Sequence, residues 1–106
     1  MNRGDVCWYM FKAPDKKRPV LILTRDSAIA VLNSVTIAPI TSTIRSIPTE
    51  IVLTEDDGLP GACAANFDNL QTVPKVNIGD RIARLTARKM KEAGAAVSFA
   101  LGLDDG

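Results

Sequence analysis

The chain has 106 residues, of which 46% are hydrophobic and 24% are charged, a composition typical of one globular domain over residues 1–106. Its 13 basic and 12 acidic side chains leave a net charge of +1, and it contains no histidine. The missing histidine excludes a Ser-His-Asp triad, a Cys-His pair and any metal site that uses imidazole. Proton transfer in an active site of this protein must therefore use other groups.

The sequence indicates a protein of the cytoplasm. No apolar run approaches the roughly 20 residues of a membrane span. Charges are scattered over the first twenty positions, where a secretory signal has a clean apolar stretch. Cys7 and Cys63 are too few for a disulfide scaffold, and neither has a neighbouring base that would activate it. We interpret both as small buried side chains.

The N-terminal third predicts two strands joined by a polar turn. Residues 4–11 alternate with apolar side chains on both faces, which predicts a strand covered on both sides, with its aromatic residues in the core. A lysine-rich turn over 12–17 follows. The continuous apolar run 18–24 then predicts a central strand, with Pro19 tolerated near its beginning.

The middle of the chain alternates turns with further strands. Asp26 or Ser27 is expected to cap a short helical turn. Residues 34–41 return to the strand pattern, and Pro39 indicates an edge or a bulge there. The remaining strand predictions are 49–54, one or two strands within 62–73, and 78–85.

The C-terminal segment predicts a helix. From residue 86 to residue 101 apolar side chains recur every three or four positions, which gives one apolar face. Thr86 is the expected N-cap and Gly102 the expected stop signal. About six short strands followed by one amphipathic helix predict a mainly β fold, a small and partly open barrel with the helix packed against it.

Charge is distributed unevenly along the chain. Residues 1–46 hold seven basic and three acidic side chains, whereas residues 47–106 hold six basic and nine acidic ones. Lys12, Lys16, Lys17 and Arg18 are clustered, which suits contact with phosphate or simply a solvated loop.

The residues available restrict the possible chemistry. The chain has no glycine-rich phosphate loop, and its cysteines lack partners at metal-ligand spacing. Arginine, hydroxyl groups and carboxylates remain, and these suit RNA cleavage by attack of a ribose 2′-hydroxyl on the adjacent phosphate. In that reaction a guanidinium neutralises charge on phosphoryl oxygens and a hydroxyl donates to one of them. Composition does not choose between such a ribonuclease and a binding module.

Several segments together resemble one protein family, and they occur in that family's order over nearly the whole chain. They are R-G-D-V-C-W at 3–8, K-R-P-V-L-I-L at 17–23, A-P-I-T-S at 38–42, P-T-E-I-V-L at 48–53, G-L-P at 58–60, D-N-L-Q-T-V at 68–73 and A-L-G-L at 100–103. The family is that of the MazF/PemK toxins, also called Kid, of toxin–antitoxin systems.

The resemblance implies an SH3-like barrel of the CcdB/PemK type with one C-terminal α-helix, present as a homodimer. It implies an endoribonuclease that needs neither metal nor cofactor. Such an enzyme cuts single-stranded RNA at short sequences and leaves a 2′,3′-cyclic phosphate and a 5′-hydroxyl. It also implies a MazE-like antitoxin, whose extended segment blocks the RNA groove, and no association with membranes.

The family's catalytic pair falls on Arg18 and Thr41. By the resemblance, Arg18 contacts the scissile phosphate and assists proton transfer, while Thr41 donates a hydrogen bond to a phosphoryl oxygen. Proton transfer is left to Arg18, to a carboxylate such as Asp15 or Asp68, or to water. The expected RNA-binding residues are Lys16, Lys17, Ser42, Thr43, Arg45, Asp68, Asn69 and Gln71.

One departure from the family and two alternative functions remain open. The first loop is short and lacks the glycine common in the family, which predicts a more open groove that grips phosphate more than base. A CcdB-type gyrase inhibitor uses a Trp-Gly-Ile end, whereas this sequence ends Leu-Asp-Asp-Gly. A non-catalytic small-barrel binding protein requires Arg18 or Thr41 to be buried, or the two to be far apart.

Overall fold

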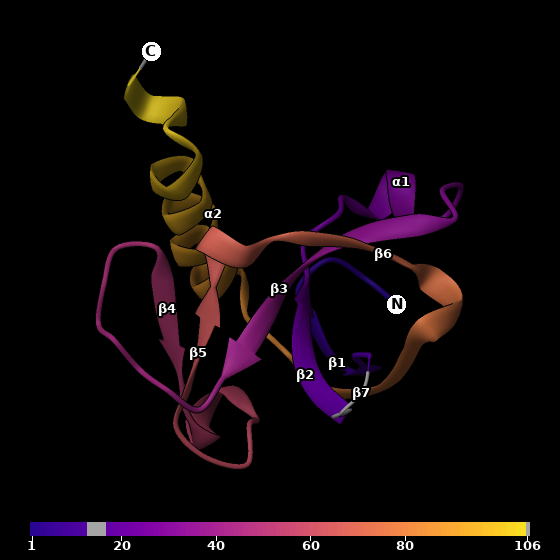
Figure 1. The fold of residues 1–106 in the computed structure, drawn as a ribbon, viewed down its shortest axis with the longest axis horizontal. Helices are drawn as coiled ribbons and strands as arrows, with labels where there is room; N and C mark the ends of the chain where they lie inside the picture. Colours follow the sequence, from indigo (N-terminus) through magenta and orange to yellow (C-terminus); the bar gives the residue numbers. More distant parts are fainter. Residues whose placement is uncertain (13–16, 106) are drawn as a thin grey trace.

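The computed structural model describes residues 1–12 and 17–105 (Figure 1). In this part of the chain seven antiparallel strands form one curved sheet, and a C-terminal helix packs against it, as predicted. The strands are β1 Asp5–Met10, β2 Lys17–Ile22, β3 Ser34–Thr41, β4 Glu50–Leu53, β5 Cys63–Asn66, β6 Gln71–Pro74 and β7 Ile78–Arg84. The helices are α1 Asp26–Ile29 and α2 Ala87–Leu101, with 3₁₀ turns η1 Glu55–Asp57, η2 Phe67–Asn69, η3 Lys75–Asn77 and η4 Leu103–Asp105.

Strand β3 organises the sheet. The strand order is β4-β5-β3-β2-β1-β7, and Figure 1 shows β3 running diagonally between the β4–β5 pair and the β2–β1–β7 group. The edge of β3 opposite β2 pairs first with β6, over Ser34–Ile37, and then with β5, over Ile40–Thr41. Pro39 lies between these two segments. Since proline has no N–H to donate, this change of neighbours accommodates it. The predicted edge strand or bulge is wrong, because β3 is an interior strand in which Pro39 pairs with Val20 of β2 without a register shift.

The predicted strand region 62–73 divides into β5 and β6 because a side chain ends the first of them. Asn66 is the N-cap of η2, and its Oδ1 accepts from the backbone N–H of Asp68 at 2.8 Å. Asparagine oxygens favour such turns over a continuing strand. The chain therefore has seven strands in its described part rather than about six.

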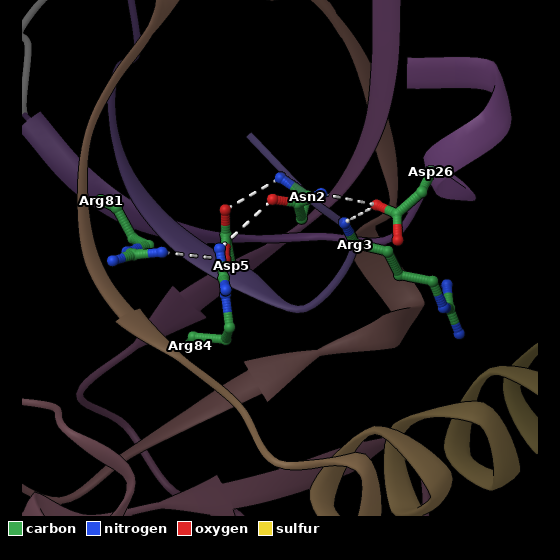
Figure 2. Close-up of polar contacts among 6 residues, drawn as sticks. All are labelled: Asn2, Arg3, Asp5, Asp26, Arg81 and Arg84. Carbon is green, nitrogen blue, oxygen red and sulfur yellow. Dashed lines mark hydrogen bonds and ion pairs between the residues drawn. The ribbon is translucent and has the colours of Figure 1, made fainter. Parts of the chain in front are cut away.

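The expected cap of the short helix α1 is wrong. Arg25 is the N-cap of α1 and makes no side-chain capping bond. Asp26 is instead the first helical residue, and its Oδ1 accepts from the backbone N–H of Arg3 at 2.7 Å (Figure 2). The Asp26 carboxylate therefore binds the distant backbone of Arg3 and does not cap α1, contrary to what the local sequence suggests.

Apolar side chains on the two faces of the sheet form two cores. Val6 and Leu21 belong to the first core, which lies against α2 and includes Ala93 of that helix. Their neighbours Cys7 and Val20 point to the other face and form the second core. The prediction of a first strand covered on both sides holds only at its start: Val6 and Cys7 are buried, but Met10 is 58% exposed.

Helix α2 begins and ends as predicted. The hydroxyl of Thr86 accepts from the backbone N–H of Lys89 at 3.1 Å, and Gly102 adopts the left-handed conformation with φ of 69°. No helix among the described residues is both long enough and apolar enough to cross a membrane.

A buried carboxylate fastens the N-terminal turn to β7. Asp5 is 2% exposed and accepts from the backbone N–H of Asn2 at 2.8 Å and from Nε of Arg84 at 2.9 Å (Figure 2). Arg81 lies 4.0 Å from the same carboxylate. Burial raises the pKa of Asp5, but the hydrogen bonds and the two positive charges outweigh burial and hold its pKa below the ordinary value.

Candidate active site

Strand register brings together the two residues that the sequence predicts to be catalytic. Val20 of β2 lies opposite Pro39 of β3. Arg18 lies two residues before Val20, and Thr41 lies two residues after Pro39, just beyond the last paired residues of the two strands. Cross-strand neighbours project from the same face of an antiparallel sheet. The two residues therefore lie on the same face and line one pocket, although they are 23 positions apart in the sequence.

Arg18 and Thr41 line a pocket of about 220 Å³, which we call the Arg18 pocket. Arg18 is exposed and Thr41 is half-buried, so both are accessible from solvent. The pocket also contains Arg45 and Asn69, two of the residues predicted to contact RNA. Its complete lining is Arg18, Pro39, Ile40, Thr41, Arg45, Asn66 and Asn69.

The hydroxyl of Thr41 is oriented by the loop that follows it. Its Oγ1 accepts from the backbone N–H of Thr43 at 3.1 Å. A hydroxyl that accepts a hydrogen bond keeps its own hydrogen for donation. Thr41 is thus able to donate to an anion in the pocket, and Thr43 contributes its backbone rather than its side chain to this arrangement.

A buried carboxylate positions Arg45 at the pocket. Glu50 begins β4, and its side chain is 1% exposed. Its Oε2 accepts from Nη1 of Arg45 at 3.3 Å, and its Oε1 accepts from the backbone N–H of Arg45 at 3.1 Å. Because a buried carboxylate needs such partners, the ion pair fixes one end of the loop between β3 and β4.

The sequence interpretation missed two residues of this site, Glu50 and Asn66. They face one another across β4 and β5. Both are buried polar residues, with Glu50 8% and Asn66 9% exposed when the whole residue is counted. Each is a polar residue next to the apolar residues of a short strand, and this pattern fits a buried polar side chain. The same pattern fits equally a polar residue at a strand end that faces solvent.

Three predicted RNA-binding residues lie outside the lining of the Arg18 pocket. Ser42 lines a neighbouring hollow of about 380 Å³ that shares Thr41 with the Arg18 pocket. Asp68 is exposed, and its Oδ2 accepts from the hydroxyl of Thr49 at 2.6 Å. Gln71 is exposed on β6, opposite Ile37.

The two predicted lysines belong to the first loop and its end. Nζ of Lys17 lies 5.5 Å from the ring centroid of Trp8, a cation–π distance. Tyr9 and Phe11 pack edge to face with their centroids 4.8 Å apart and border the second core. Lys16 and the short loop around it, including Asp15, lie outside the described residues.

Neither metal nor thiol chemistry is indicated in the described part of the chain. No group of three His, Cys, Asp or Glu side chains there is arranged to hold a metal ion. Both cysteines are buried, and burial raises the pKa of each thiol above its ordinary value. At neutral pH both are therefore protonated, as expected for small core side chains. The chemistry of the pocket consists of two guanidiniums, a hydroxyl and two amides.

The model of one protein family matches residues 2–101: the PemK-like, MazF-like toxins of type II toxin–antitoxin systems. The chain belongs to this family. The family resemblance that the sequence motifs carry is thereby confirmed.

Two curated relatives of the MazF family match this chain over most of their own length. Endoribonuclease MazF3 of Mycobacterium tuberculosis is 40% identical over 90 residues, which are 85% of this chain and 87% of the relative. Probable endoribonuclease MazF2 of the same species is 36% identical over 94 residues, 88% and 90% of the two chains. These relatives confirm the predicted enzyme class, an endoribonuclease toxin.

Two solved MazF structures share the fold. The Mycobacterium tuberculosis toxin MazF-mt6 superposes with a TM-score of 0.84 at 34% identity, covering 92% of this chain and 96% of the toxin. An endoribonuclease from a mycobacterial species, solved in complex with its cognate antitoxin, gives a TM-score of 0.83 at 30% identity, covering 97% and 96%. The predicted mainly β fold with a C-terminal helix is thus confirmed.

Proposed function

We propose that this toxin is a metal-independent endoribonuclease that cuts single-stranded RNA, with Arg18 and Thr41 acting on the scissile phosphate. The observation that carries the proposal is their meeting in one accessible pocket from adjacent strands. A non-catalytic binding protein requires one of them to be buried or the two to be apart. Arg18 is exposed, and it shares its pocket with Thr41.

The reaction uses a nucleophile that RNA itself supplies. The ribose 2′-oxygen attacks the adjacent phosphorus and loses its proton, while the bond from phosphorus to the 5′-oxygen breaks and that oxygen gains a proton. The products are a 2′,3′-cyclic phosphate and a 5′-hydroxyl. Arg18 neutralises the charge that develops on the phosphoryl oxygens, and Thr41 donates to one of them.

The proton carriers in this proposal are Arg18, a carboxylate or water, since histidine is absent. Asp68 is less suited than water, because it lies outside the lining of the Arg18 pocket and its Oδ2 is bonded to Thr49. Asp15 belongs to the undescribed segment of the first loop.

The RNA strand is proposed to run over the basic and polar residues around the pocket. Arg45 and Asn69 reach the pocket itself, and Ser42 borders the adjoining hollow. Positive side chains follow a phosphate backbone without reading its sequence, whereas amides are able to read unstacked base edges. The other proposed contacts are Lys16, Lys17, Thr43, Asp68 and Gln71.

The proposed partners are a second copy of the chain and a MazE-like antitoxin. A relative of 30% identity has been solved with its cognate antitoxin. Large apolar side chains remain exposed near the end of α2, with Phe99 59%, Leu101 56% and Leu103 63% exposed. An exposed apolar group of this kind suits a surface that another chain covers.

The experiment is incubation of the purified protein with mixed RNA in the presence of EDTA, followed by mapping of the new 5′ ends. We expect cuts at a short recurrent sequence, each leaving a 5′-hydroxyl. Cleavage that EDTA abolishes would contradict metal independence. No cleavage under any condition would overturn the proposed activity and favour a binding protein.

A further inference from the structure

Asn66 lines the Arg18 pocket and has only the oxygen of its side-chain amide engaged in a hydrogen bond. It is 9% exposed and ends β5. Its amide lies against the backbone N–H of Asp68, which can only donate, so the atom at 2.8 Å is the oxygen. The Nδ2 group is consequently the part turned away from the turn, and it has no hydrogen-bond partner among the described residues.

The register of β3 and β5 places Asn66 beside Thr41. Thr41 lies opposite Ala64, so Asn66, two residues along β5, is the diagonal neighbour of Thr41 on the same face. Diagonal neighbours on a sheet are about 7–8 Å apart, a separation that one phosphate group with its oxygens is able to bridge. Asn66 and Thr41 both line the pocket with Arg18.

A buried amide N–H that lacks a partner is costly and rare in folded proteins. Where one occurs at a pocket, a ligand that accepts a hydrogen bond removes the cost. The flanking guanidinium of Arg18 selects an anionic acceptor. A phosphoryl oxygen meets both requirements, since it is negatively charged and accepts several hydrogen bonds at once.

We propose that Asn66 is a third substrate-contacting residue, whose Nδ2 group donates to a non-bridging oxygen of the scissile phosphate. This inference rests on the proposed ribonuclease activity. Arg18 supplies charge, Thr41 supplies one neutral donor, and Asn66 supplies a second neutral donor from the next strand. A rigid, partly buried donor of this kind is most effective where charge accumulates in the transition state.

The position also has a structural role, which the test must separate from the proposed one. Asn66 caps η2, and aspartate and serine cap helical turns about as well as asparagine. Asn66→Asp keeps the capping oxygen and the size of the side chain but removes the donor. Asn66→Ser keeps a capping oxygen without adding charge and is too short to reach a ligand in the pocket.

The matched control is Asn77→Asp. Asn77 is exposed in η3 and lines none of the pockets described above, so this variant adds the same charge elsewhere. Circular dichroism and thermal unfolding show whether each variant keeps the fold. Cleavage is measured under single-turnover conditions with saturating enzyme, on an RNA carrying a mapped cleavage sequence.

We expect Asn66→Asp and Asn66→Ser to keep the fold and to lose about 100-fold in the single-turnover rate, with Asn77→Asp close to wild type. Wild-type rates in both Asn66 variants, beside an inactive Arg18→Ala, would overturn this inference and leave the proposed function standing. Absence of cleavage by the wild type would overturn both.

Sulfur substitution identifies the atom that Asn66 contacts. In RNA with sulfur in place of one non-bridging oxygen at the scissile phosphate, the wild type slows for the stereoisomer whose oxygen Asn66 contacts. We expect Asn66→Ser to slow little further on that stereoisomer. An equal additional loss on both stereoisomers would place the contact on another part of the RNA and contradict the phosphate assignment.

Discussion

Arg45 and Glu50 form a two-point contact at the edge of the Arg18 pocket. The guanidinium Nη1 of Arg45 donates to Oε2 of Glu50 at 3.3 Å, and its backbone N–H donates to Oε1 at 3.1 Å. The Glu50 side chain is buried whereas the Arg45 side chain is 54% exposed. The buried carboxylate therefore holds the positive charge of Arg45 at the surface. The loop after β3 is thereby fixed relative to Thr41.

We expect Glu50→Gln to reduce RNA cleavage about tenfold and the free energy of unfolding by about 1–3 kcal/mol. The amide oxygen still accepts from the backbone of Arg45, but the charge that attracts the guanidinium is lost. Glu92→Gln is the control, because Glu92 is 52% exposed and pairs only loosely with Lys89 at 4.0 Å. Kinetics and urea unfolding of both variants measure the effect, and equal behaviour of the two would contradict it.

The proposed catalytic pair predicts loss of cleavage without loss of fold. Arg18→Ala and Thr41→Val each remove a group that faces the pocket, and neither group belongs to a buried core cluster. We expect each to lower cleavage by at least about 100-fold, since each removes charge stabilisation in the transition state. Growth inhibition on induction should disappear with it, while circular dichroism stays unchanged. Wild-type cleavage by both variants would show that the roles are misassigned.

The depressed pKa of Asp5 predicts a pH-dependent contribution to stability. A carboxyl whose pKa is lower in the folded state stabilises the fold above its unfolded pKa of about 3.9 and loses this contribution as pH falls toward the folded pKa. At pH 7 we expect Asp5→Asn to lower the free energy of unfolding by about 3 kcal/mol.

Unfolding measured between pH 2 and 7 tests this prediction. The difference between wild type and Asp5→Asn should be constant above about pH 5 and shrink below about pH 4. Asp80→Asn removes an exposed carboxyl from the same neighbourhood and should have little effect at any pH. A difference that persists unchanged at pH 2 would show that Asp5 acts by packing rather than by charge.

The absence of histidine predicts the pH dependence of cleavage. Histidine is the side chain whose unperturbed pKa, about 6.5, lies in the neutral range. Because the chain has none, a plot of log kcat/KM against pH should show no inflection near 6.5. An inflection there would contradict proton transfer by Arg18 or water and assign it to a strongly shifted carboxyl or to the terminal amine.

Local sequence signals were sufficient where the deciding contacts are local. The cap at Thr86 and the stop at Gly102 depend on hydrogen bonds within one turn, and both predictions are confirmed. The cap of α1 was wrong because Asp26 bonds to Arg3, 23 positions away. The pattern over 62–73 fits one strand or two, because the turn at Asn66 also depends on pairing with the neighbouring strands.

The sequence by itself determined the family, the succession of strands ending in a helix, and the candidate pair Arg18 and Thr41. These follow from short motifs and from the period of apolar residues, which the chain carries whether or not it is folded. Only the tertiary structure decided that Asn66 lines the Arg18 pocket and that Glu50 holds Arg45 beside it. Their roles arise from burial and from cross-strand register, and both exist only once β3, β4 and β5 lie side by side.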